Sequence, residues 1–133
     1  MKTVTTYQAV LGRLIVRKRQ EKQMDQEGLA RRVGVSRSTW SRIEAGSSAL
    51  NMDQLAKAAE ALDVSLGELM MEADEVVREL RTQDVEVNVG RDRAVSAKPW
   101  ARGAAVAFLG GAVLSGVIAA VLAEKNKEDG DDQ

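Results

Sequence analysis

Hydroxyl and guanidinium side chains alternate in residues 36–47, SRSTWSRIEAGS. An arginine can donate two parallel hydrogen bonds to a phosphate or to the O6 and N7 atoms of guanine, and a serine or threonine hydroxyl can donate to either. On a helix, Trp40 and Ile43 share one face because they are three residues apart, which leaves Arg37, Ser38 and Arg42 on the other. The stretch predicts a helix that one face holds on a core while the other contacts an anionic partner.

The charge distribution supports an anionic partner for this half of the chain. Residues 17–42 hold eight Lys and Arg against three Asp and Glu, although the net charge of the 133-residue chain is only -1. Residues 1–70 carry a net charge of +3 and residues 71–133 carry -4. A local basic excess of this kind favours association with polyanions.

The composition argues against an enzyme. The chain has no cysteine and no histidine, which excludes disulfides, thiol catalysis, imidazole acid-base chemistry and most transition-metal sites. It has no phosphate-binding glycine loop, and the acidic residues DGDD of the tail lack the spacing of a metal loop. We therefore expect no catalytic residues, no cofactor and no metal site.

Capping residues and apolar spacing predict five short helices. The first covers residues 6–23, where apolar residues recur at spacings of three and four. Helix N-caps are then expected at polar residues that precede apolar runs, and Gly34 is expected to end the second helix in a left-handed conformation. The expected N-caps are Asp25, Ser36, Asn51 (with Gln54 as a capping box) and Ser65. These helices predict a compact domain over residues 1–81 with its core in 6–70.

The pattern changes after residue 81. Val85, Val87 and Val89 alternate with polar residues as in a strand, but an isolated strand has no partner unless another chain supplies one. The following GRDRAVSAKP contains glycine, charge and the only proline. We interpret residues 82–99 as a linker that holds a short strand.

Residues 104–123, AAVAFLGGAVLSGVIAAVLA, contain no charged residue. A helix of this length spans about 30 Å, the thickness of a bilayer core. The alternative is a buried helix of a soluble domain, but the run shows no polar face. We therefore expect a transmembrane helix over 100–124 and an acidic tail over 125–133. Basic residues precede the span, which favours a single-pass protein of the cytoplasmic membrane with its N-terminal domain in the cytoplasm.

Small residues recur every four positions along this run, a spacing that allows two helices to approach closely. The row predicts packing between spans in a homodimer or homo-oligomer, which residues 71–90 could also mediate. Chance is the alternative, because the segment is rich in alanine and glycine. The packing residues expected are Gly103, Ala107, Gly111, Ser115 and Ala119.

Residues 25–46, DQEGLARRVGVSRSTWSRIEAG, resemble the helix-turn-helix of the Cro/XRE family of phage-repressor-like DNA-binding domains. The resemblance extends from about Val10 to Met70, about half of the chain, and includes IEAG at 43–46 and LAKAAEALDVSLGEL at 55–69. It implies an all-α, five-helix domain whose recognition helix, residues 36–45, enters the major groove of double-stranded DNA.

The same resemblance assigns roles to individual residues. It implies base contacts for Arg37, Ser38 and Arg42, beside which Ser41 also faces outward. It implies phosphate contacts for Gln26, Ser36, Thr39 and Ser47, with the Gln26 amide also bonding the recognition helix. Arg19 and Glu44 occupy the positions of a structural ion pair in the family.

Two functions are consistent with the sequence. The first is a membrane-anchored, sequence-specific transcriptional regulator, a repressor that binds half-sites about 34 Å apart as a dimer. The alternative is a membrane-anchored scaffold whose helix-turn-helix domain binds protein, as in the cell-shape proteins of the RodZ type, which are similar in layout. We expect no counterpart to the large external domain of those proteins, because few residues follow the expected span.

Overall fold

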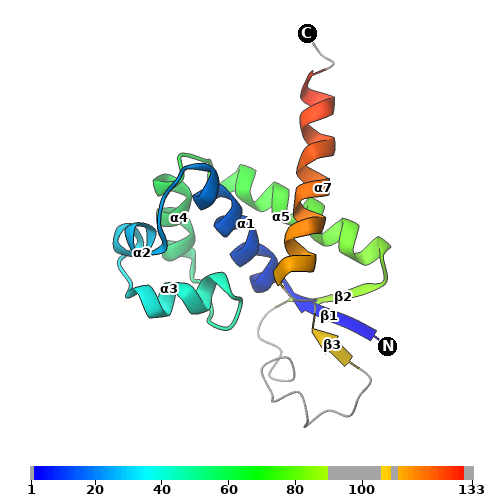
Figure 1. Ribbon diagram of the computed structural model, residues 1–133, viewed down its shortest axis with the longest axis horizontal. Helices are drawn as coiled ribbons and strands as arrows, with labels where there is room; N and C mark the ends of the chain where they lie inside the picture. The colour runs from blue at the N-terminus through cyan, green and yellow to red at the C-terminus, as the bar shows by residue number, and fades with distance from the viewer. Residues whose placement is uncertain (1, 90–105, 109–110, 131–133) are drawn as a thin grey trace.

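The computed structural model describes residues 2–89, 106–108 and 111–130. Its N-terminal part is built from α1 (Tyr7–Glu21), α2 (Gln26–Val33), α3 (Arg37–Glu44), α4 (Met52–Ala61) and α5 (Leu66–Thr82). Helix α1 runs through the middle of this group, with α2, α3 and α4 on one side of it and α5 along another (Figure 1). The predicted five-helix domain is present.

Local capping starts these helices where the sequence predicts. Asp25 accepts a hydrogen bond from the Gly28 amide at 2.6 Å, and Ser65 caps α5 by accepting from the Glu68 amide. Asn51 and Gln54 form a complete capping box at the start of α4. Each cap satisfies an amide that would otherwise lack a partner in the first helical turn.

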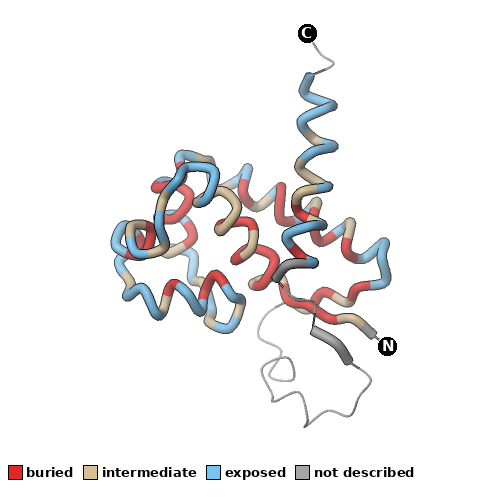
Figure 2. Tube along the Cα trace, in the orientation of Figure 1, coloured by how far each residue is buried: buried red, intermediate tan, exposed pale blue. Residues whose placement is uncertain are grey.

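The core fills the space between α1 and the other helices. Figure 2 shows the buried positions in red on the facing sides of these helices. Val10, Leu14 and Ile15 of α1 are fully buried, as are Leu29 of α2 and Leu69 of α5. Burying a side chain of this size contributes about 1.5–3 kcal/mol, so α1 is the main support on which the rest of the domain is placed.

The chain also forms a parallel sheet, so the fold is mostly helical rather than all-α as predicted. Strand β1 (Lys2–Thr6) lies between β2 (Val85–Asn88) and β3 (Val106–Phe108), with Thr3 opposite Val85 and Lys2 opposite Val106. The strand expected around 85–89 is therefore confirmed, and its partner comes from the N-terminus of the same chain. Parallel pairing needs a long crossover, and the helical domain itself provides it.

Helix α7 (Gly111–Gly130) corrects the predicted transmembrane helix over 100–124. Residues 106–108 of that span form β3, and in the ranges described no helix combines the length and apolar composition that crossing a membrane requires. The apolar side chains of α7 instead pack on the domain, where Leu114 and Ile118 are each 1% exposed. The C-terminal half of α7 projects beyond the other helices and is largely exposed (Figures 1 and 2).

The expected row of small packing residues is not on one helix. Ala107 lies in β3, Gly111 begins α7, and Gly103 falls outside the described residues. Ser115 is exposed on α7, and Ala119 is half-buried.

Candidate nucleic-acid interface

The turn between α2 and α3 fixes the direction of α3. Gly34 ends α2 with φ 89°, a left-handed conformation that a residue with a Cβ adopts only with strain. The amides of Gly34 and Val35 both donate to the Ala30 carbonyl, at 2.9 and 3.0 Å. Ser36 follows at once as the N-cap of α3 and accepts from the Thr39 amide at 3.2 Å. The chain therefore reverses into α3 within three residues.

The inner face of α3 is buried in the core. Trp40 is 0% exposed and Ile43 is 2% exposed, as their three-residue spacing predicts. Glu44 is also buried, at 2% exposed, although a carboxylate is rarely buried without partners. Glu44 lies at the C-terminal end of α3, so the groups that bind its carboxylate also hold this end of the helix in place.

The Glu44 carboxylate accepts four hydrogen bonds from three side chains. Arg19 donates from Nε to Oε1 at 2.8 Å and from Nη2 to Oε2 at 3.2 Å. Gln26 donates from Nε2 to Oε2 at 2.9 Å, and Trp40 donates from Nε1 to Oε1 at 2.8 Å. The carboxylate thus joins α1, the start of α2 and α3, and Arg19 and Glu44 occupy the geometry of the expected ion pair.

The backbone at the end of α3 touches α1 directly. The Glu44 carbonyl accepts from Nε and Nη2 of Arg13, at 3.3 and 3.1 Å. A Cβ built on Gly12 would lie 2.5 Å from the same carbonyl oxygen, so only glycine allows this approach. A guanidinium at the C-terminal end of a helix also stabilises the partial negative charge there.

The outer face of α3 is polar and accessible. Arg37, Ser38, Ser41 and Arg42 are exposed, together with the capping Ser36. The Ser36 hydroxyl donates to Thr39 Oγ1 at 2.9 Å, and its oxygen lies 3.2 Å from Ser38 Oγ. Two guanidinium groups and several hydroxyls therefore lie on the exposed side of the helix, while Trp40 and Ile43 are buried on the other.

Two further residues expected at a phosphate backbone flank this face. Gln26 is half-buried at the start of α2, where its amide nitrogen is bound to Glu44. Ser47 is exposed just after α3, and its hydroxyl donates to the Arg42 carbonyl at 3.2 Å. Gly46, which precedes Ser47, has φ 80°. A Cβ at Gly46 would lie 2.7 Å from Ala9 Cα, so the loop after α3 lies close to α1.

Trp40 and Arg13 are partners of Glu44 that the sequence analysis did not identify. For Trp40 the signal was present, since residues four apart on a helix are neighbours. Arg13 carries no comparable local signal, because it lies 31 positions from Glu44 in the chain.

Residues 15–69 match the helix-turn-helix family, and this match covers α2, α3, α4 and parts of α1 and α5. None of the curated proteins matches the chain. The structure is similar to that of the clp gene regulator ClgR from Corynebacterium glutamicum, with a TM-score of 0.56 and 21% sequence identity over 72% of this chain and 94% of that chain. A second crystal structure of ClgR from C. glutamicum gives a TM-score of 0.48 and 26% identity over 51% of this chain and 88% of that chain. At this identity, the first similarity shows a shared fold.

Proposed function

We propose that this protein is a sequence-specific DNA-binding transcriptional regulator that inserts α3 into the major groove. The observation that carries the proposal is the two-sided structure of α3: Trp40 and Ile43 are buried, while Arg37 and Arg42 are exposed on the opposite side. The match of residues 15–69 to the helix-turn-helix family supports it. The fold is also that of a protein described as a gene regulator.

The dimensions and chemistry of α3 are suited to base recognition. The major groove of B-DNA is about 12 Å wide, close to the diameter of a helix with its side chains. In our proposal Arg37, Ser38 and Arg42 contact base edges, and Ser41 faces the groove between them. Gln26, Ser36, Thr39 and Ser47 contact phosphates on either side.

We further propose that the protein acts as a dimer and represses transcription. A dimer would place two α3 helices on half-sites about 34 Å apart, one turn of the double helix. Repression rests on the resemblance to phage-repressor-like domains. The scaffold alternative gains no support from α3, since its exposed side chains are arginines and serines rather than apolar groups.

Selection of duplexes from a random pool by the full chain tests the proposal. We expect enrichment of a guanine-containing site, and a loss of discrimination of about 1–3 kcal/mol for Arg37→Ala and for Arg42→Ala, the usual worth of a bidentate base contact. Arg78→Ala is the matched control, because Arg78 is exposed on α5, which carries none of the proposed contacts. Failure to enrich any sequence would refute sequence-specific binding.

Location at the cytoplasmic membrane is inferred from the sequence alone and stays a prediction. Fractionation of cells that produce the full chain tests it. Recovery of the protein in the soluble fraction without detergent would contradict it.

A further inference from the structure

Helix α7 is attached to the domain through one face of its first turns. Leu114 and Ile118, four residues apart, are each 1% exposed where α7 crosses α1 and α5. Val113 is 58% exposed and faces away. The helix is therefore a separate element that a few apolar side chains hold on the surface of α1, the helix that also supports α3.

Arg13 lies between α7 and the end of α3. Its guanidinium donates twice to the Glu44 carbonyl at the C-terminus of α3. The same side chain lines a cavity of about 70 Å³ together with Ser115 and Ile118 of α7. Arg13 and the docked face of α7 thus share the wall of one small cavity, so the position of α7 sets the surroundings of the guanidinium that binds α3.

A second connection runs through the buried carboxylate of Glu72 on α5. Glu72 Oε2 lies 2.8 Å from Lys18 Nζ on α1, and Oε1 lies 3.9 Å from Lys125 Nζ on α7. Lys18 precedes Arg19, the partner of Glu44, in the same helix. Both connections from α7 therefore reach the part of α1 that binds Glu44. The first reaches Arg13, which binds Glu44 itself, and the second reaches Lys18, the neighbour of Arg19.

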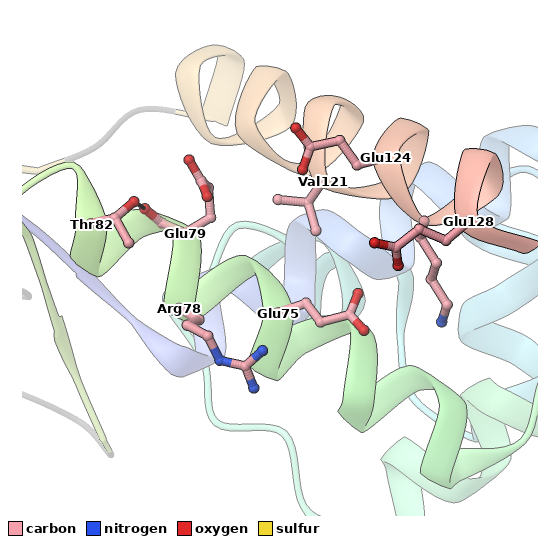
Figure 3. Close-up of a pocket in the computed structure, with 8 residues that line it drawn as sticks. Glu75, Arg78, Glu79, Thr82, Val121, Glu124 and Glu128 are labelled. Carbon is pink, nitrogen blue, oxygen red and sulfur yellow. Dashed lines mark hydrogen bonds between the residues drawn. The ribbon is translucent and has the colours of Figure 1, made fainter.

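The C-terminal part of α7 is held less closely. A groove of about 310 Å³ separates it from α5, and Figure 3 shows Glu124 and Glu128 of α7 on one wall and Glu75 and Glu79 of α5 on the other. Carboxylates on both walls repel each other, and Arg78 and Lys125 offset only part of this charge. The attachment of α7 consequently depends on its apolar contacts. Leu114 and Ile118 are buried there, and Val117, Val121 and Leu122 are partly buried against the core.

We propose that Arg13 is a positioning residue through which the docking of α7 controls the placement of α3. The proposal rests on the proposed function of α3 and names its regulation. Docked α7 holds Arg13 against the Glu44 carbonyl and the helix in its DNA-binding position. Release of α7 exposes Arg13 to water, loosens the C-terminal end of α3 and weakens DNA binding.

The test compares two aspartate substitutions on opposite faces of α7 in the full chain. Ile118→Asp places a charge in the interface and releases α7, whereas Val113→Asp places the same charge on the exposed face. Ile118→Ala is a milder variant that weakens the attachment without a buried charge and is used if Ile118→Asp does not fold. Amide hydrogen exchange reports on α7 and α3, and fluorescence anisotropy with the selected duplex reports on affinity.

For Ile118→Asp we expect faster exchange in α7 and at the C-terminal end of α3, with an affinity for DNA that falls about five-fold or more. Val113→Asp should change neither. In an Arg13→Met background, Ile118→Asp should have no further effect on affinity, and Arg13→Lys should restore part of the coupling because it keeps the charge.

Faster exchange in α7 with unchanged exchange in α3 and unchanged affinity would overturn the inference. An equal effect of Ile118→Asp in the presence and absence of Arg13 would overturn the assignment to this residue. If the wild-type protein binds no DNA, the proposed function fails, and hydrogen exchange at the end of α3 still decides whether the docking of α7 reaches it.

Discussion

Substitution of Glu44 by glutamine is the most demanding test of how α3 is held. The change keeps the size of the side chain and removes its charge. In the native protein the carboxylate is 2% exposed and accepts from Arg19, Gln26 and Trp40. A glutamine offers one acceptor oxygen and presents an amide nitrogen, a donor, to groups that are themselves donors.

The expected loss follows from the geometry. The Arg19 side chain is 13% exposed, so the substitution leaves a guanidinium charge without its partner in a largely buried place. Breaking a buried pair by removing one partner costs about 3–5 kcal/mol, and the four hydrogen bonds do not add independently to this figure. Against a total stability of about 5–15 kcal/mol, a loss of about 3–5 kcal/mol removes at least about a fifth.

Urea denaturation followed by far-ultraviolet circular dichroism measures this loss as a lower midpoint with an unchanged slope. Glu27→Gln is the matched control, because it removes the same charge from an exposed ion pair. The Glu27 and Arg31 side chains are 65% and 77% exposed, and their charged atoms lie 3.8 Å apart. The substitution should therefore change the free energy of unfolding by no more than about 0.5 kcal/mol. A variant Glu44→Gln within about 1 kcal/mol of the wild type would refute the reasoning. In a double variant, Arg19→Met with Glu44→Leu should recover a large part of the loss, since no buried charge remains.

Three further predictions concern the packing and capping of the domain. Gly12→Ala should lower the free energy of unfolding by about 1–3 kcal/mol, because the added Cβ would meet the last carbonyl of α3. In the control Gly67→Ala the added Cβ meets nothing within 4 Å, so the free energy of unfolding should rise by up to about 1 kcal/mol. Equal effects of the two substitutions in urea denaturation would contradict the close contact at Gly12. Ser36→Ala should cost about 0.5–2 kcal/mol and Ser36→Gly only a few tenths, measured in the same way, and an equal loss for both would argue against a capping role. The pKa of Tyr7 is raised from 10 to about 12, mainly by burial and next by the hydrogen bond to Asp74. The folded state therefore keeps this proton to higher pH than the unfolded state, so the contribution of Tyr7 to stability is complete below pH 10 and is lost as the pH rises through about 12. Tyrosinate absorbance of this single tyrosine checks the midpoint, Tyr7→Phe should abolish the loss, and a midpoint near pH 10 in the folded protein would contradict the raised pKa.

The helix-turn-helix could be predicted because its signals are local. Gly34 and the capping residues Asp25, Ser36 and Asn51 each act within one or two turns of their own position, and all of them act as expected. The buried side of α3 was also evident from the spacing of Trp40 and Ile43. Arg13 was not, because its contact with the end of α3 depends on how closely two helices approach, which Gly12 permits and no sequence period encodes.

The sheet could not be predicted because its pairing is long-range. The segment KTVTT, residues 2–6, pairs with residues 85–88, and only the folded helical domain brings them together. The expected transmembrane helix over 100–124 gains no support from the described residues, for a related reason. An uncharged apolar run fits a bilayer and the surface of a domain equally well, and the receiving surface on α1 and α5 becomes visible only in three dimensions.

Protection of guanine N7 from methylation in the selected duplex tests the central claim most directly, because N7 faces only the major groove. The account predicts that the full chain protects specific guanines and that Arg42→Ala removes protection at one of them while the others persist. Binding that leaves every guanine N7 as reactive as in free DNA would contradict the insertion of α3 into the major groove.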